Sequence, residues 1–198
     1  MESTLADTRI LIKKIAGWCG IIQGTAWEIM SIISIILYVK GPSNFEPIPE
    51  SYMEYINRVI TNMFLNYSGE AFPNQILTGS VFHGFMWTHL FTNIIWIIFS
   101  ALLLRKKQTN ESKVFIQWSY ATFLVCFLDF ITVVILGADY GKCYRKAKEM
   151  GYMALSYEGI CVNGIITVLV IAARGFVLWG INLVLAFAMY RIGRHLKS

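Results

Sequence analysis

The hydrophobic positions of this chain gather into four long runs, at residues 15–39, 81–104, 114–136 and 160–190. Each run is long enough to cross the hydrocarbon core of a membrane, which takes about 20 residues of helix. The fourth run exceeds that length, so we expect it to tilt or to project beyond the membrane. The pattern predicts an all-α, polytopic membrane protein with one four-helix transmembrane domain over residues 1–198.

The first run also has to be weighed as a secretion signal. The apolar part of a signal peptide is about 7–15 residues long, and a cleavage site with small residues follows it. Residues 15–39 are longer than that and no such site follows them. We therefore expect this run to be retained as a signal anchor.

The segment between the first two runs, residues 40–80, has a helical pattern of its own. Ser51-Tyr-Met-Glu54 matches a capping box, which begins many helices. Apolar residues at helical spacing follow it: Met53, Ile56, Val59, Ile60, Met63, Phe64 and Tyr67. They predict an extra amphipathic helix of about four turns in the first external loop. We expect it to pack on the outer ends of the spans or to lie on the lipid surface; the alternative is a surface for a partner protein.

Lys and Arg divide unevenly between the two sides that four spans create. The two ends of the chain and the loop 105–113 carry ten of them, whereas the loops 40–80 and 137–159 carry six. The positive-inside rule therefore predicts a multi-pass protein with cytosolic termini, a cytosolic loop 105–113 and two external loops. The basic cluster at residues 142–148 runs against this rule.

Two covalent modifications are predicted on the external side. Asn66-Tyr-Ser68 is an acceptor triplet for N-glycosylation, although Asn110-Glu-Ser112, on the predicted cytosolic side, matches the same pattern. Cys143 and Cys161 flank the second external loop, where the environment is oxidising. We expect a disulfide between them, with two free thiols as the alternative.

Composition narrows the class of partner. The chain is 56% hydrophobic and 15% charged, whereas soluble domains carry roughly a quarter charged residues. The net charge of +5 comes from short basic groups beside apolar runs, the arrangement that membranes impose on loops. The expected partner is therefore the lipid bilayer, and nucleic acid is not expected.

One polar side chain in each apolar run stands at a similar depth. Counted at about 1.5 Å per residue from the nearest cytosolic basic residue, Glu28 lies about 21 Å deep, Asp129 about 24 Å and Arg174 about 25 Å. His89 falls in the same layer of the second run. A charge at mid-membrane costs several kcal/mol and is rare without a partner or a function. We expect these four residues to form an intramembrane polar cluster, since the five donors of Arg174 can bridge two carboxylates.

The polar cluster has two interpretations. In the first, it fixes the register of a helix bundle that lacks a hydrophobic driving force inside lipid. In the second, it forms part of an ion or proton pathway.

Glycines in two of the runs favour close packing of helices. Gly20-x-x-x-Gly24 permits a neighbouring helix to approach the first span closely, and Gly175 leaves room on the fourth span beside Arg174.

Motifs of known enzyme chemistry are missing from the sequence. It contains no Walker loop, dinucleotide fingerprint, nucleophile elbow or zinc-type cysteine pattern. The three histidines, His83, His89 and His195, do not have the spacing of a metal site. We expect no enzyme activity, no catalytic residue, no metal and no cofactor.

The fourth run carries a resemblance to a known group. Ala172-Ala-Arg-Gly-Phe-Val-Leu-Trp-Gly-Ile-Asn182 is similar to the last span of small insect four-span membrane proteins, a group that includes the Pasiflora proteins of septate junctions. The general plan of four spans with a longer external loop also resembles that group. The resemblance implies a non-enzymatic protein that is a structural or assembly component of a membrane complex, namely an insect occluding junction. The implied partners are other junction proteins or further copies of the chain. The alternative is a small ion or proton channel or transporter subunit that uses the polar layer.

Overall fold

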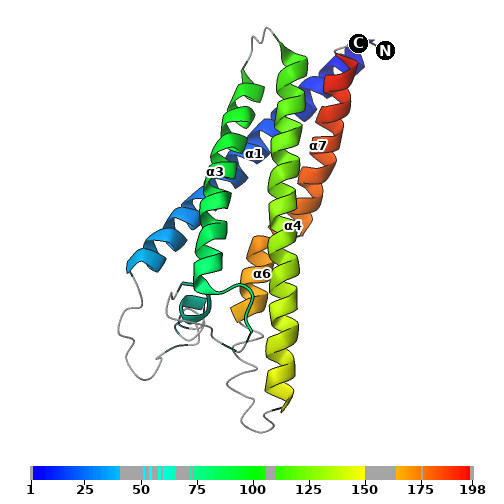
Figure 1. The fold of residues 1–198 in the computed structure, drawn as a ribbon. Helices are drawn as coiled ribbons and strands as arrows, with labels where there is room; N and C mark the ends of the chain where they lie inside the picture. Colours follow the sequence, from blue (N-terminus) through cyan, green and yellow to red (C-terminus); the bar gives the residue numbers. More distant parts are fainter. Residues whose placement is uncertain are drawn as a thin grey trace. The chain divides into compact units, whose positions relative to one another are not determined.

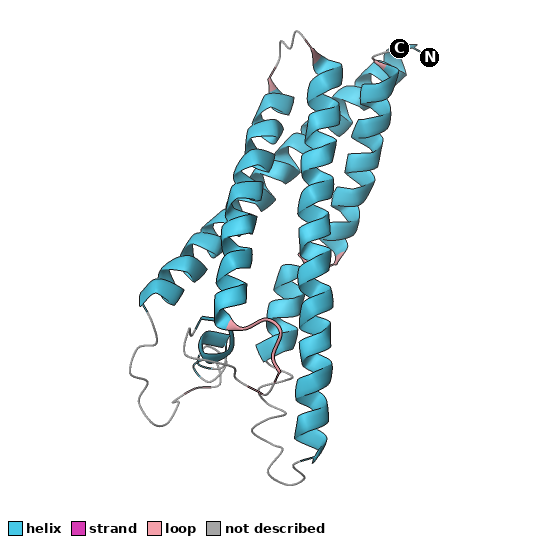
Figure 2. Ribbon diagram, in the orientation of Figure 1, coloured by secondary structure: helices cyan, strands magenta, loops and turns pink. Residues whose placement is uncertain are grey.

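A computed structural model of the chain describes residues 2–40, 51, 54, 58, 60–65, 72, 74–105, 110–149, 164–174 and 176–196. Over these residues the secondary structure is helical and no strand is present, as the cyan ribbon of Figure 2 shows. The predicted all-α class is confirmed.

Among the described residues, four helical segments are long and apolar enough to cross a membrane (Figure 1). Three are single helices: α1 (Glu2–Lys40), α3 (Gly79–Leu104) and α4 (Glu111–Glu149). The fourth, Ile166–His195, consists of two helices, α6 (Ile166–Ala172) and α7 (Val177–His195). The predicted number of spans is therefore confirmed, and the chain has the helices of a multi-pass membrane protein.

The spans expose apolar side chains and bury polar ones, the reverse of what helices of a soluble protein do. Large apolar side chains are exposed along them, including Ile22, Phe91, Phe127 and Val184, which are 59–69% exposed. The buried side chains include many polar ones: Gln23, Asn93, Ser100, Ser119, Thr122, Asp129 and Asn182. Lipid tails would solvate the exposed apolar side chains, while polar groups in a membrane need partners inside the protein.

Two of the helices continue well beyond the apolar runs that predicted them. Helix α4 has 39 residues, which corresponds to about 58 Å, nearly twice the thickness of a hydrocarbon core. Residues 137–149, which we expected to form part of the second external loop, are helical. Hydropathy marks where a helix is apolar and not where it ends; Lys, Ala and Glu are good helix formers in water, so α4 does not stop at its last apolar turn.

The chain divides into two compact units. Unit 1 comprises residues Met1–Met30, Thr88–Leu128 and Phe176–Ser198, and unit 2 comprises Ser31–Trp87 and Asp129–Gly175. Helices α1, α3 and α4 each contribute residues to both units, and the fourth span passes from unit 2 to unit 1 between α6 and α7.

Unit 1 is built on a close approach of α1 to α3. Gly17, Gly20 and Gly24 lie on one face of α1, and each faces a side chain of α3. A Cβ atom added at Gly20 would come within 3.0 Å of the Ser100 Cβ, and one added at Gly24 would come within 2.7 Å of the Ile97 Cγ1. Glycine at these positions therefore allows the two helices to pack backbone to side chain.

Hydrogen bonds join α3 to α4 in unit 1 through two buried tryptophans. The Trp96 Nε1 donates to Thr122 Oγ1 (2.8 Å), and the Trp118 Nε1 donates to Ser100 Oγ (2.9 Å). Each hydroxyl in turn donates to the backbone carbonyl of the tryptophan on its own helix. We call this four-residue arrangement the reciprocal Trp–hydroxyl motif. It satisfies both indole donors inside the bundle.

One end of unit 1 gathers the two chain ends and the start of α4. Lys13 in α1 forms an ion pair with Glu111 (2.8 Å), and the Ser112 hydroxyl donates to the Gly193 carbonyl of α7 (2.7 Å). The first turn of α4 therefore lies beside both α1 and the last turns of α7, which four crossings of a membrane require. Placement of this end in the cytosol stays a prediction.

In unit 2, part of the first loop packs against the helices. The Glu54 backbone N–H donates to Ser51 Oγ (3.2 Å), the bond expected of the capping box. The short π-helix η1 (Thr61–Leu65) follows, and its Met63 and Phe64 are buried in one apolar cluster with Leu136 and Ile165. The described part of the predicted amphipathic segment is therefore packed on the spans; most of its other residues lie outside the described ones.

Candidate functional site

The fourth span is interrupted at the arginine that its sequence made conspicuous. We expected one continuous helix over 160–190, whereas α6 ends at Ala172 and α7 begins at Val177. The Arg174 N–H donates to the Ile171 carbonyl three residues back, and Arg174 and Phe176 have φ values of 50° and 55°. Side chains other than glycine rarely adopt this left-handed region, so the helix cannot continue through it.

Arg174 contacts a carboxylate of another helix within unit 2. Its Nε donates to Asp129 Oδ2 of α4 at 2.6 Å, and the side chains are 0% and 1% exposed. The short distance is typical of a charge-assisted hydrogen bond. A buried charge without an opposite charge would cost far more than the backbone strain at Arg174, so the pair holds the interruption in place.

The other two members of the predicted polar cluster belong to unit 1. His89 of α3 is 6% exposed, and Glu28 of α1 is partly buried. The structure thus brings Asp129 and Arg174 together in unit 2 and places Glu28 and His89 in unit 1. A single cluster of all four residues stays a prediction.

The remaining predicted positions have mixed outcomes. Gly20 and Gly24 face α3 as described above, whereas Gly175 lies outside the described residues. Cys143 is fully buried in unit 2, and Cys161 lies outside the described residues. Asn66 also lies outside them. Disulfide formation and glycosylation therefore stay predictions.

A second buried acid, Asp139 of α4, was missed by the sequence reasoning. Its two carboxylate oxygens accept hydrogen bonds from the backbone N–H groups of Ile76 and Leu77, at 2.8 and 2.7 Å. The side-chain amide of Gln75 donates to the Met63 and Leu77 carbonyls. These bonds attach the segment that leads into α3 to the face of α4. The signal in the sequence is an acid one helical turn beyond the apolar run, at a position that the sequence predicts to lie in the second external loop.

A second missed feature is a buried amide pair in unit 1. Gln23 of α1 and Asn182 of α7 donate to each other's side-chain oxygens, at 3.3 and 2.9 Å. Trp179 of α7 also donates to the Cys126 carbonyl of α4 (3.0 Å). Among the described residues, no group of three or more His, Cys, Asp and Glu side chains is placed to hold a metal ion.

Comparison with known proteins identifies no relative of the chain. No protein-family model matches the chain, and no curated protein or solved structure is significantly similar to it.

Proposed function

We propose that this chain is a non-enzymatic integral membrane protein that acts as a structural or assembly component of a membrane complex. One observation carries the proposal: two sets of buried polar side chains in unit 1 form hydrogen bonds between helices. The Gln23–Asn182 amide pair joins α1 to α7, and the reciprocal Trp–hydroxyl motif joins α3 to α4.

This use of polar groups favours a static bundle over a conduit. Side chains that line a pathway must be open to water or to the transported ion, and polar residues recur along successive turns. The amides and hydroxyls named above have partners on the neighbouring helix instead. A bundle joined in this way is static, which suits an assembly component that presents a fixed surface to other membrane proteins.

Insect occluding junctions are the proposed setting, on the strength of the resemblance of residues 172–182 to the Pasiflora group. The proposal includes a plasma-membrane location with cytosolic termini, glycosylation of Asn66 and a Cys143–Cys161 disulfide on the external side. The proposed partners are other junction proteins or further copies of the chain.

A second candidate function rests on the interrupted fourth span. Discontinuous helices with ionisable residues at the break form the ion and substrate sites of many transporters. The Asp129–Arg174 pair beside the end of α6 has this character. A small ion or proton channel or transporter subunit is therefore the alternative.

Three measurements in one system separate these functions. The chain with a C-terminal tag is expressed in a polarised insect epithelium, and its position, the dye permeability of the cell layer and the membrane current are recorded after depletion and rescue. An assembly component should concentrate at the lateral junction, and its loss should open the barrier. Rescue by Glu28→Gln should be nearly complete. A current that appears with the chain and disappears with Asp129→Asn, at equal surface expression, would establish the alternative instead.

A further inference from the structure

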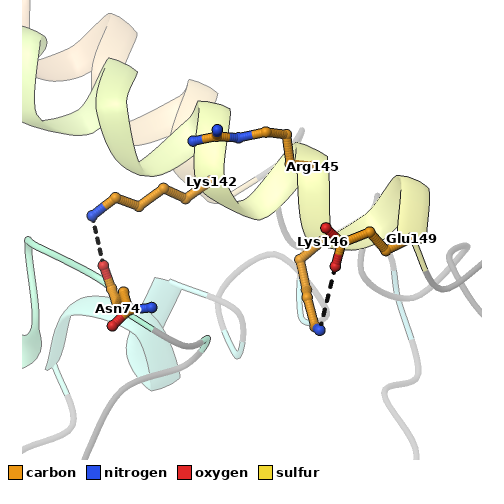
Figure 3. Close-up of a pocket in the computed structure, with 5 residues that line it drawn as sticks. All are labelled: Asn74, Lys142, Arg145, Lys146 and Glu149. Atoms are coloured by element: carbon orange, nitrogen blue, oxygen red, sulfur yellow. Dashed lines mark hydrogen bonds and ion pairs between the residues drawn. The ribbon is translucent and has the colours of Figure 1, made fainter.

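The end of α4 in unit 2 carries a cavity that neither proposed function uses. Its volume is about 390 Å³, and five residues line it: Asn74, Lys142, Arg145, Lys146 and Glu149. Figure 3 shows the Lys142 and Arg145 side chains extending the same way from the helix, with Asn74 opposite the Lys142 amino group. The volume is at the lower end of the range for small-ligand sites, so it suits a single compact group.

The cavity is positively charged. Three basic side chains and one acidic one line it, which gives a net charge of +2. Lys146 and Glu149 are 3.5 Å apart and both exposed, so their pairing is weak. The Arg145 Nε donates to the Gly141 carbonyl (3.3 Å), and among the described residues its two terminal Nη groups have no hydrogen bond. A guanidinium in this state can bind two oxygens of one phosphate.

The wall opposite α4 is fixed before any ligand arrives. The Lys142 amino group donates to the Asn74 carbonyl (2.8 Å), and Asn74 has a left-handed φ of 61°. Two and three residues later, the backbone of Ile76 and Leu77 is bound by Asp139, one helical turn before Lys142. A ligand therefore does not have to order this segment, which lowers the cost of binding.

The position along α4 points to the source of the ligand. The apolar run ends at Leu136, and Lys142 and Arg145 follow six and nine residues later, about 9 and 14 Å further along the helix. Headgroups occupy roughly the first 5–8 Å beyond each face of the hydrocarbon core. Long basic side chains at this level reach the phosphate layer of a membrane.

We propose that this cavity binds a phosphate group, carried by an anionic phospholipid headgroup or by a free phosphate, with Arg145 as the bidentate donor and Lys142 and Lys146 as flanking charges. Basic residues in the last turn of a helix also stabilise its dipole. The dipole alone does not account for a cavity that has Asn74 of another segment as its opposite wall. The inference goes beyond the proposed function, because it concerns a ligand and not assembly.

The test uses the purified full chain in neutral detergent micelles. Binding of short-chain phosphatidic acid, short-chain phosphatidylcholine and inorganic phosphate is measured by calorimetry, and lipid retention by native mass spectrometry. Arg145→Gln is compared with Lys148→Gln, which removes the same charge from the same helix end but lies outside the cavity. Arg145→Lys keeps the charge and removes the pair of guanidinium N–H donors that can bind two oxygens of one phosphate. Lys146→Gln is a second cavity variant, and each variant must elute as a single folded species.

We expect saturable binding of phosphatidic acid or phosphate that falls at least about tenfold in Arg145→Gln. Lys148→Gln should change it by less than about twofold. Tighter binding of the lipid than of phosphate identifies the headgroup as the source, and equal binding identifies the free anion. The site is disproved if neither ligand binds better than phosphatidylcholine, or if Lys148→Gln weakens binding as much as Arg145→Gln.

Discussion

Arg174 shows what a single charge demands in this fold. It is among the largest fully buried side chains, and it meets Asp129 at 2.6 Å. The attraction in such a pair offsets the loss of water around both charges only when the geometry is good. Removal of one partner leaves the other buried and uncompensated. The pair is therefore expected to matter most when it is broken and much less when it is replaced as a whole.

Replacement of Arg174 by leucine should destabilise the protein by about 3 kcal/mol or more, because the Asp129 carboxylate stays in its buried position. Folded yield, measured by fluorescence-detected gel filtration of a tagged chain, should fall. The double variant Arg174→Leu, Asp129→Leu removes both charges and should recover most of the yield. Normal yield of the single variant would show that the pair does not hold the interruption.

The hydrogen bonds of Asp139 are expected to hold the end of the first loop against α4. Substitution by alanine removes the acceptor of two backbone N–H groups, each bond to a charged group being worth about 1.5–3 kcal/mol. Hydrogen exchange of the peptide that contains Ile76 and Leu77 should then accelerate. Exchange in the α3 segment around Trp96 belongs to unit 1 and serves as the internal control; equal acceleration in both segments would indicate general unfolding and not a local attachment.

At the scale of helices, small residues and tryptophans act together. Gly20 faces Ser100, and Ser100 is the acceptor for Trp118 in the reciprocal Trp–hydroxyl motif. Interhelical hydrogen bonds in membranes are each worth about 0.6 kcal/mol on average, so none of them alone holds the bundle. Close approach of α1 and the α3–α4 bonds depend on the same serine, which couples the packing of three helices.

Substitution of Gly20 by alanine should disturb this arrangement. The added Cβ would overlap Ser100, and overpacking of this kind costs about 1–3 kcal/mol. Gly84 of α3 is the matched control, since a Cβ there would meet nothing within 4 Å beyond its neighbours and the backbone of its own helix. Thermal aggregation midpoints in detergent should fall for Gly20→Ala and stay close to the parent for Gly84→Ala. Equal midpoints would show that α1 does not pack on α3 at this point.

The sequence predicted the helices better than their interruptions and ends. Four apolar runs were enough to predict four spans, because the length and polarity of a span are set by the membrane itself. The break at Arg174 depends on the φ angles of Arg174 and Phe176, and hydropathy carries no information about backbone angles. The bonds of Asp139 join residues 62 and 63 positions apart, and the Gln23–Asn182 pair joins residues 159 apart. Such pairings depend on how the helices pack, which no local pattern records.

At the scale of the whole molecule, orientation in the membrane follows from where the charges lie. The end of unit 1 that contains Lys13, Glu111 and Gly193 includes most of the basic residues counted on the predicted cytosolic side. The basic end of α4 in unit 2 is the feature that opposes the positive-inside rule. If it binds phosphate as proposed, these residues have a ligand of their own, and their weight in the topology count falls.

The two acceptor triplets of the sequence turn this orientation into an experiment. Glycosyl transfer takes place only on the luminal side, so cytosolic termini predict that Asn66 is modified and Asn110 is not. Asn66→Gln should abolish a glycosidase-sensitive shift on a denaturing gel, and Asn110→Gln, the matched control, should leave it unchanged. Loss of the shift in Asn110→Gln alone would show that the chain has the opposite orientation in the membrane. It would place the loop 105–113 and both termini outside the cell, and the basic end of α4 would then face the anionic cytosolic leaflet, where phosphate-bearing headgroups are most abundant.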